Sequence, residues 1–64
     1  MSADQIDSAI KAVPAHPNPL IALGLAEGLT IAYFASQQIN SDQFNRFCER
    51  IRRIGVQLKE RSFS

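Results

Sequence analysis

The chain has 64 residues, a net charge of +1, 45% hydrophobic and 20% charged residues, a composition typical of a folded domain and not of a disordered chain. This length suffices for one domain but buries too little surface to be comfortably stable alone. Because it contains one cysteine, Cys48, and one histidine, His16, an internal disulfide and a tetrahedral zinc site are excluded, and we expect association to complete the fold without a metal or cofactor.

A first helix is predicted over residues 3–13. Ser2 and Gln5 have the spacing of a capping box. The opening residues lack the basic start and apolar core of a signal peptide, which together with the lone thiol predicts a cytoplasmic location. Residues 14–19, PAHPNP, are expected to form a stiff connector. The apolar positions of the first helix share one stripe: Ala3, Ile6, Ala9, Ile10 and Val13.

A second helix is predicted over residues 19–38, with Asn18 as its N-cap and Pro19 at its first position. From Leu20 to Ala35 the only charged residue is Glu27. This apolar stretch is shorter than the ~20 residues that span a bilayer, and it carries an acid near its middle. We therefore expect a buried helix and no membrane partner.

Small residues gather on one side of this second helix. Each glycine weakens a helix interior by roughly 1 kcal/mol relative to alanine, so a close approach of another backbone is expected to offset the loss. The same helix in a second copy, related by a two-fold axis, would provide this contact in a homodimer. Alternatively, the first or third helix of the same chain fills the space. The predicted self-association residues are Gly24, Gly28, Ala32 and Ala35, with Leu25 beside them.

A turn is predicted around Asn40, which suits a left-handed helix C-cap, and a third helix over residues 42–60, with Ser41 and Asp42 at its N-terminus. The sequence thus predicts an all-α fold of three helices, with a long antiparallel helical hairpin completed by homodimerisation. The apolar seam of the third helix is spaced 3-4-3-4, at Phe44, Phe47, Ile51, Ile54 and Leu58.

The hairpin also predicts a structural ion pair for Glu27. In an antiparallel hairpin turning at Asn40, Glu27 lies level with Arg53, and Arg50 lies one turn nearer the turn. An acid flanked by apolar residues requires a cation, and arginine can donate two hydrogen bonds to a carboxylate. We therefore expect Glu27 to pair with Arg53.

No motif of catalysis or nucleotide binding is present in the sequence. Cys48 falls beside the apolar seam, where a free cysteine is usually a small core residue, and His16 lies in the proline-rich connector. We therefore expect no catalytic residue, no small-molecule substrate and no enzymatic activity.

Charge is divided unevenly along the chain. Residues 1–40 carry three acids and one base, a net of −2, whereas residues 41–64 carry six bases and three acids, a net of +3. Such a split permits charge complementarity between subunits, or an anionic partner for the basic third helix, either a protein or a nucleic acid. The segment fits a helix-turn-helix motif poorly. Phe34 occupies the position at which that motif favours a small residue, and Gln38 occupies the turn position at which it favours glycine. The candidate partner-binding residues are Arg46, Arg50, Arg52 and Lys59.

The stretch ASQQINSDQFNRFCERIRR, residues 35–53, resembles small helical proteins of bacteriophages and other mobile elements. In those proteins a helix ends in a short polar turn, and an arginine-rich second helix opens with the pattern I-S/N-x-x-x-F/Y. The resemblance implies an accessory protein that binds and modulates, by inhibition or regulation, a protein of its host. It transfers no functional residue.

Overall fold

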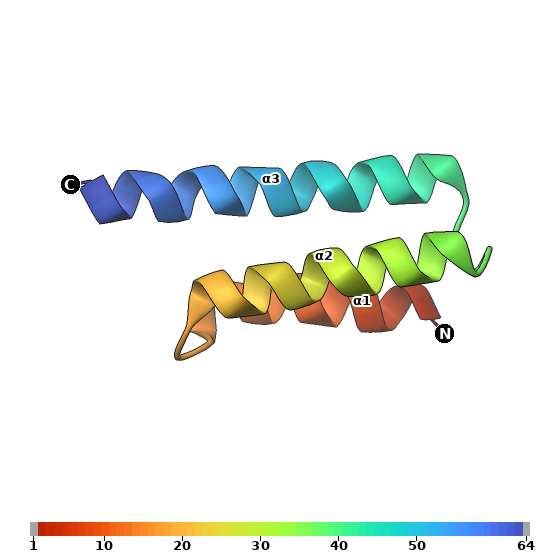
Figure 1. Cartoon of the computed structure of the whole chain (residues 1–64), viewed down its shortest axis with the longest axis horizontal. Coiled ribbons are helices and arrows are strands. Elements are labelled where there is room, and N and C mark those ends of the chain that lie inside the picture. The colour runs from red at the N-terminus through yellow and green to blue at the C-terminus, as the bar shows by residue number, and fades with distance from the viewer. Residues whose placement is uncertain (1, 64) are drawn as a thin grey trace.

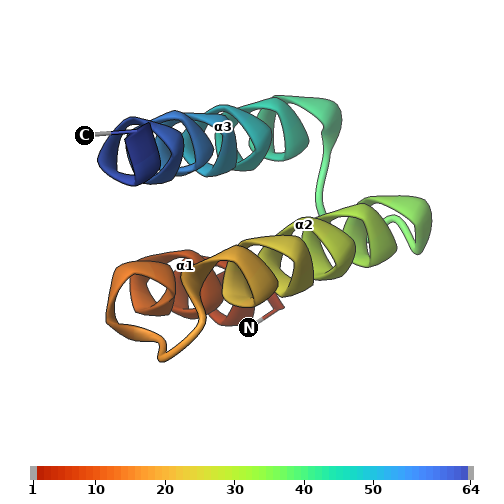
Figure 2. The ribbon, with the colours of Figure 1, turned by 60° about the vertical axis from the view of Figure 1, so that its left-hand side comes forward.

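Three helices make up the computed structural model, which describes the backbone of residues 2–63 and the side chains of residues 4–61. Helix α2 runs antiparallel to both α1 and α3 (Figure 1). Helices α1 and α2 lie side by side, and α3 runs along this pair (Figure 2). The predicted all-α fold with a long helical hairpin is therefore confirmed. The elements are α1 (Ser2–Ala12), a 3-10 turn η1 (Val13–Ala15), α2 (Pro19–Ala35) and α3 (Ser41–Phe63).

Helix α1 presents its predicted stripe to the core, as far as the side chains are described; Ala3 lies outside the described side chains. Ile6, Ile10 and Val13 follow one another at intervals of four and three residues, and all are fully buried. Pro14 cannot donate a backbone hydrogen bond, so the α-helix gives way to the 3-10 turn at this point. The Ser2 side chain of the predicted capping box lies outside the described side chains. Gln5 instead accepts a hydrogen bond from the Tyr33 hydroxyl of α2.

The connector and the start of α2 follow the sequence-based prediction. Asn18 is the N-cap, its Oδ1 accepts the Ile21 backbone N–H at 3.4 Å, and Pro19 occupies the first helical position. The Asn18 backbone N–H in turn donates to His16 Nδ1 at 2.9 Å. These contacts tie the connector to the first turn of α2.

The end of α2 differs from the prediction. The helix stops at Ala35, and the left-handed residue is Gln37, with φ 63°, and not Asn40. The Gln37 N–H donates to Phe34 O at 3.0 Å and the Gln38 N–H to Tyr33 O at 2.9 Å, the pair of bonds that defines a Schellman motif. The last carbonyls of α2 are thereby satisfied without Asn40.

Asn40 serves the next helix instead. Its Oδ1 accepts the Gln43 N–H at 2.8 Å, while Gln43 Oε1 accepts the Asn40 N–H at 3.0 Å. This reciprocal pair is a capping box, and it places the start of α3 at Ser41. Ile39 is buried, and Phe44 packs against the core that contains it. Both ends of the short turn are therefore fixed by hydrogen bonds.

The core lies where α2 faces α1 and α3. None of the helices in the described part of the chain is long and apolar enough to cross a membrane. Thr30 is the buried polar residue of this core, and its hydroxyl donates to Ala26 O at 2.8 Å. The buried hydrophobic residues are Ile6, Ile10, Val13, Ala22, Ala26, Ile39 and Ile51. The half-buried hydrophobics packed on them are Ala9, Leu23, Leu29, Tyr33, Phe44, Phe47, Ile54 and Leu58.

Candidate interaction surfaces

The outer face of α2, turned away from the core, carries only apolar residues. At 100° per residue these residues occupy a continuous sector of about 140°. The exposed fractions of its large side chains are 64% for Leu20, 56% for Ile21, 65% for Leu25 and 56% for Ile31. The face consists of Leu20, Ile21, Gly24, Leu25, Gly28, Ile31, Ala32 and Ala35, all of them exposed.

The two glycines of this face contact neither α1 nor α3. A Cβ atom added at Gly24 or Gly28 would meet no atom within 4 Å outside the local helix backbone. The alternative that the chain's own helices fill the small-residue sector is therefore wrong. Self-association through this sector stays a prediction.

The close approach between helices occurs at a different glycine. A Cβ atom added at Gly55 of α3 would lie 3.3 Å from Leu23 Cδ2 of α2. Gly55 is half-buried in the hairpin. The position of Gly55, next to Ile54 on the apolar side of α3, could have indicated this contact. The close approach was predicted at the two glycines of α2 because they are spaced one helical turn apart.

A groove of about 430 Å³ runs between α2 and α3. No residue of α1 lines it. Its apolar lining includes Phe44, whose ring stacks on that of Phe34 at a centroid distance of 4.3 Å. The groove is open, so it presents an elongated apolar surface and not an enclosed cavity. The lining residues are Leu23, Glu27, Ile31, Phe44, Cys48, Ile51, Arg52, Gly55, Val56 and Lys59.

Three charged residues line this apolar groove. Arg52 and Lys59 belong to α3 and stand two turns apart on one side of that helix, while Glu27 comes from α2. Within the described residues none of the three is engaged in an ion pair. The groove therefore combines apolar side chains with two cations on its α3 side that form no ion pair in the described structure.

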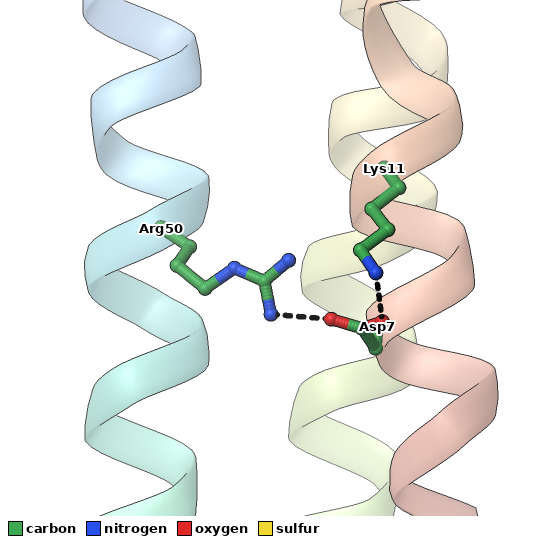
Figure 3. Close-up of polar contacts among 3 residues, drawn as sticks. All are labelled: Asp7, Lys11 and Arg50. Atoms are coloured by element: carbon green, nitrogen blue, oxygen red, sulfur yellow. Dashed lines mark hydrogen bonds and ion pairs between the residues drawn. The ribbon is translucent and has the colours of Figure 1, made fainter.

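The Arg50 side chain forms an ion pair with α1 inside the fold (Figure 3). Its Nη1 donates to Asp7 Oδ1 of α1 at 2.7 Å, and Lys11 Nζ lies 3.0 Å from Asp7 Oδ2. Both hydrogen bonds lower the pKa of the Asp7 carboxyl, and the bond from Lys11 has the larger effect. The Arg50 guanidinium also lies 5.9 Å from the centre of the Phe47 ring. Arg50 thus ties α1 to α3, and its predicted binding to a partner stays a prediction.

The predicted Glu27–Arg53 ion pair is wrong. Arg53 Nη2 donates to Glu49 Oε1 at 2.9 Å, one turn away on the same helix. Glu27 is exposed at the groove and therefore has no need of a buried cation. The hairpin register places residues at the same height, but it does not fix the direction in which their side chains point.

Arg46 lies on a different side of α3 from the two cations of the groove. Arg46 is exposed and lies six residues before Arg52, which at 100° per residue places the two about 120° apart around the helix. Glu49 lies one turn from Arg46 and pairs with Arg53. Of the four predicted partner-binding residues, the groove thus brings together Arg52 and Lys59 and leaves out Arg46 and Arg50.

Cys48 and His16 occupy different parts of the fold. Cys48 is half-buried in the α2–α3 groove, whereas His16 Nδ1 is engaged in the α1–α2 connector. Within the described residues no group of three His, Cys, Asp or Glu side chains is placed to hold a metal ion.

No family model, curated protein or solved structure matches this chain.

Proposed function

We propose that this chain is a non-enzymatic interaction protein, which binds an amphipathic helix of another protein in the α2–α3 groove. The observation that carries the proposal is the groove itself, in which exposed apolar side chains lie beside two cations without an ion-pair partner in the described structure. Val56 is 50% exposed and Phe34 is 39% exposed at or beside the groove. Exposed apolar surface bordered by polar residues is typical of a protein-binding site.

The dimensions of the groove suit a helix. Its lining runs along α3 from Phe44 to Lys59, a length of about 22 Å at the helical rise per residue. A partner helix of about four turns covers this length and can lay its apolar stripe between α2 and α3. Gly55 carries no side chain where α3 contacts Leu23, so no α3 side chain fills the groove at this point.

The charges at the groove favour an acidic partner on one side. Arg52 and Lys59 lie on the α3 side, seven residues apart, so carboxylates spaced by two helical turns on the partner can reach both. Glu27 lies on the α2 side and favours a base on the opposite edge of the partner. These contacts would select the orientation of the bound helix.

A small protein that covers a helix in this way would regulate or inhibit the protein to which that helix belongs. The bound segment becomes inaccessible to its other contacts for as long as the complex lasts. The resemblance of residues 35–53 to accessory proteins of phages and mobile elements supports such a modulating role.

Nucleic-acid binding is the second candidate, favoured by the exposed Arg46, Arg52 and Lys59. It is weaker because Arg50 and Arg53 are held in ion pairs, and because Arg46 and Arg52 point to different sides of α3. Helices α2 and α3 also run alongside each other in opposite directions (Figure 1), unlike the steeply crossed pair of a helix-turn-helix.

The test is affinity capture from nuclease-treated lysate of the source cells, with wild type, Arg52→Glu and Arg46→Glu as baits. Both substitutions change one exposed arginine of α3 to an acid, but only Arg52 lines the groove. We expect a captured protein to be retained by Arg46→Glu and lost from Arg52→Glu. With the purified partner, Arg52→Glu should weaken binding about tenfold or more, equivalent to at least about 1.4 kcal/mol.

Two results would count against this function. Equal capture by both variants would show that the groove is not the binding site. Loss of all capture after nuclease treatment, with a salt-dependent shift of DNA or RNA in a gel, would instead support the nucleic-acid alternative, because phosphate contacts release counterions.

A further inference from the structure

Helix α2 reverses the usual placement of side chains in a small protein. The residues of α2 that are buried are Ala22, Ala26 and Thr30, all of them small. Its large apolar side chains Leu20 and Leu25 point outward and are about two-thirds exposed. Large aliphatic residues are usually the most deeply buried in a fold, so an exposed helix face of this kind indicates a surface that is covered by another molecule.

The outer face of α2 is also neutral over its whole length. No charged or hydrogen-bonding side chain lies between Leu20 and Ala35 on this face, and Glu27 stands at its edge. A charged partner finds no counter-charge here, whereas an identical face offers the same length and the same apolar character. The neutral outer face thus differs in character from the α2–α3 groove, whose charges suit a different protein, and Ile31 lies at the border of the two surfaces.

We infer that a second copy of this chain covers the outer face of α2, by packing α2 against α2 around a two-fold axis near Gly28. This inference goes beyond the groove function and does not depend on it. Measured at 100° per residue, Leu25 and Ile31 lie about 60° to either side of Gly28, and Gly24 and Ala32 lie about 40° to either side.

The face is therefore complementary to itself. A two-fold axis at Gly28 sets the large Leu25 and Ile31 of one copy against the small Gly24 and Ala32 of the other, whether the helices run parallel or antiparallel. Gly28 meets its own symmetry mate, and the absence of a Cβ atom there lets the two backbones come close. Isologous dimers require this kind of self-complementarity.

The area available is sufficient for a dimer. If each of the four large side chains exposes about 100 Å² of apolar surface and the small residues contribute the rest, each copy offers on the order of 500 Å². That is about a tenth of the 4645 Å² accessible surface of the chain, the usual share for a small protein. Two copies then bury on the order of 1,000 Å², where specific interfaces begin.

Sedimentation equilibrium of the full chain, from submicromolar to submillimolar concentration, tests the inference. We expect a reversible dimer for wild type. Gly28→Leu should weaken association about 100-fold, because the new side chain overpacks the symmetry axis. It should leave the helical content of the monomer unchanged, because nothing lies within 4 Å of a Cβ at this position. Leu25→Ser, which removes an outward-facing side chain, should act in the same direction.

Val56→Ser provides the matched control. Val56 is 50% exposed but lies in the α2–α3 groove and not on the outer face, so this variant should dimerise like wild type. A wild type that stays monomeric throughout, or a dimer unaffected by Gly28→Leu and Leu25→Ser, would overturn the inference. It would also be overturned by a dimer lost only in Val56→Ser, or by a monomer that binds phosphatidylcholine vesicles through Leu25.

Discussion

Alanine at Gly24 or Gly28 should stabilise the folded monomer. Both glycines lie inside α2, and an added Cβ atom at either position meets nothing within 4 Å. The substitution therefore restores the helix propensity of alanine, about 1 kcal/mol at each site, with no steric cost. In a chain of this size, 1 kcal/mol raises Tm by about 4–8 °C. The double variant should gain about twice as much, because the two methyl groups meet no shared partner.

Gly55→Ala is the matched comparison for this prediction. It introduces the same methyl group into a helix interior, but its Cβ atom would lie 3.3 Å from Leu23 Cδ2. The Leu23 side chain must move by a few tenths of an ångström, so part of the propensity gain is lost. We expect Gly24→Ala to raise Tm more than Gly55→Ala does.

Thermal unfolding followed by circular dichroism in a dilution series measures both effects. At the lowest concentrations, where monomers predominate, Gly24→Ala should melt above wild type. At high concentration the advantage should shrink, because the added methyl group also occupies space that the second copy is inferred to fill. If Gly24→Ala is no more stable than Gly55→Ala in the most dilute samples, Gly24 does not face open solvent and the described placement of α2 is incorrect.

Two further predictions concern the α2–α3 turn and the α1–α3 contact. Gln37→Gly should raise the free energy of unfolding by about 0.5–1 kcal/mol in urea titrations, because Gln37 adopts a left-handed conformation that glycine tolerates better; an unchanged or lower value would contradict the Schellman geometry. The lowered pKa of Asp7 in the fold means that this carboxylate stabilises the protein above its ordinary pKa of 3.8, and that the contribution is lost as the pH falls through the lower pKa of the folded state. Asp7→Asn should therefore be less stable than wild type at neutral pH and approach it in acid, whereas parallel stability curves would show that the bonds from Lys11 and Arg50 are not formed in solution.

The helices themselves follow from patterns that act over a few residues. Hydrophobic spacing predicted all three, and the Asn18–Pro19 pair predicted where the second begins, since an N-cap and an N1 proline are local features. The turn was less predictable, because either Gln37 or Asn40 could adopt the left-handed conformation that ends the second helix. Asn40 instead forms a capping box with Gln43, and this second use of the side chain decides between them.

The sequence alone could not tell which side of α2 faces the core. Its apolar residues surround the helix almost completely, and Ala22, Ala26 and Thr30 form a small-residue stripe as regular as that of Gly24, Gly28 and Ala32. The choice between two such stripes depends on where α1 and α3 dock. The partners of the arginines depend on the same docking, since Arg50 reaches Asp7 only because α1 packs beside α3.

The hydrogen-bonded turn between α2 and α3 has a consequence for the order of folding. Its Schellman bonds and its capping box join residues no more than five positions apart, so closing the turn costs little loop entropy. The α2–α3 hairpin can therefore form within the microsecond-to-millisecond range of helical proteins with low contact order. The Asp7–Arg50 bond spans 43 residues and closes when α1 docks. Changes at the turn should then alter the folding rate, whereas loss of the Asp7–Arg50 bond should mainly speed unfolding.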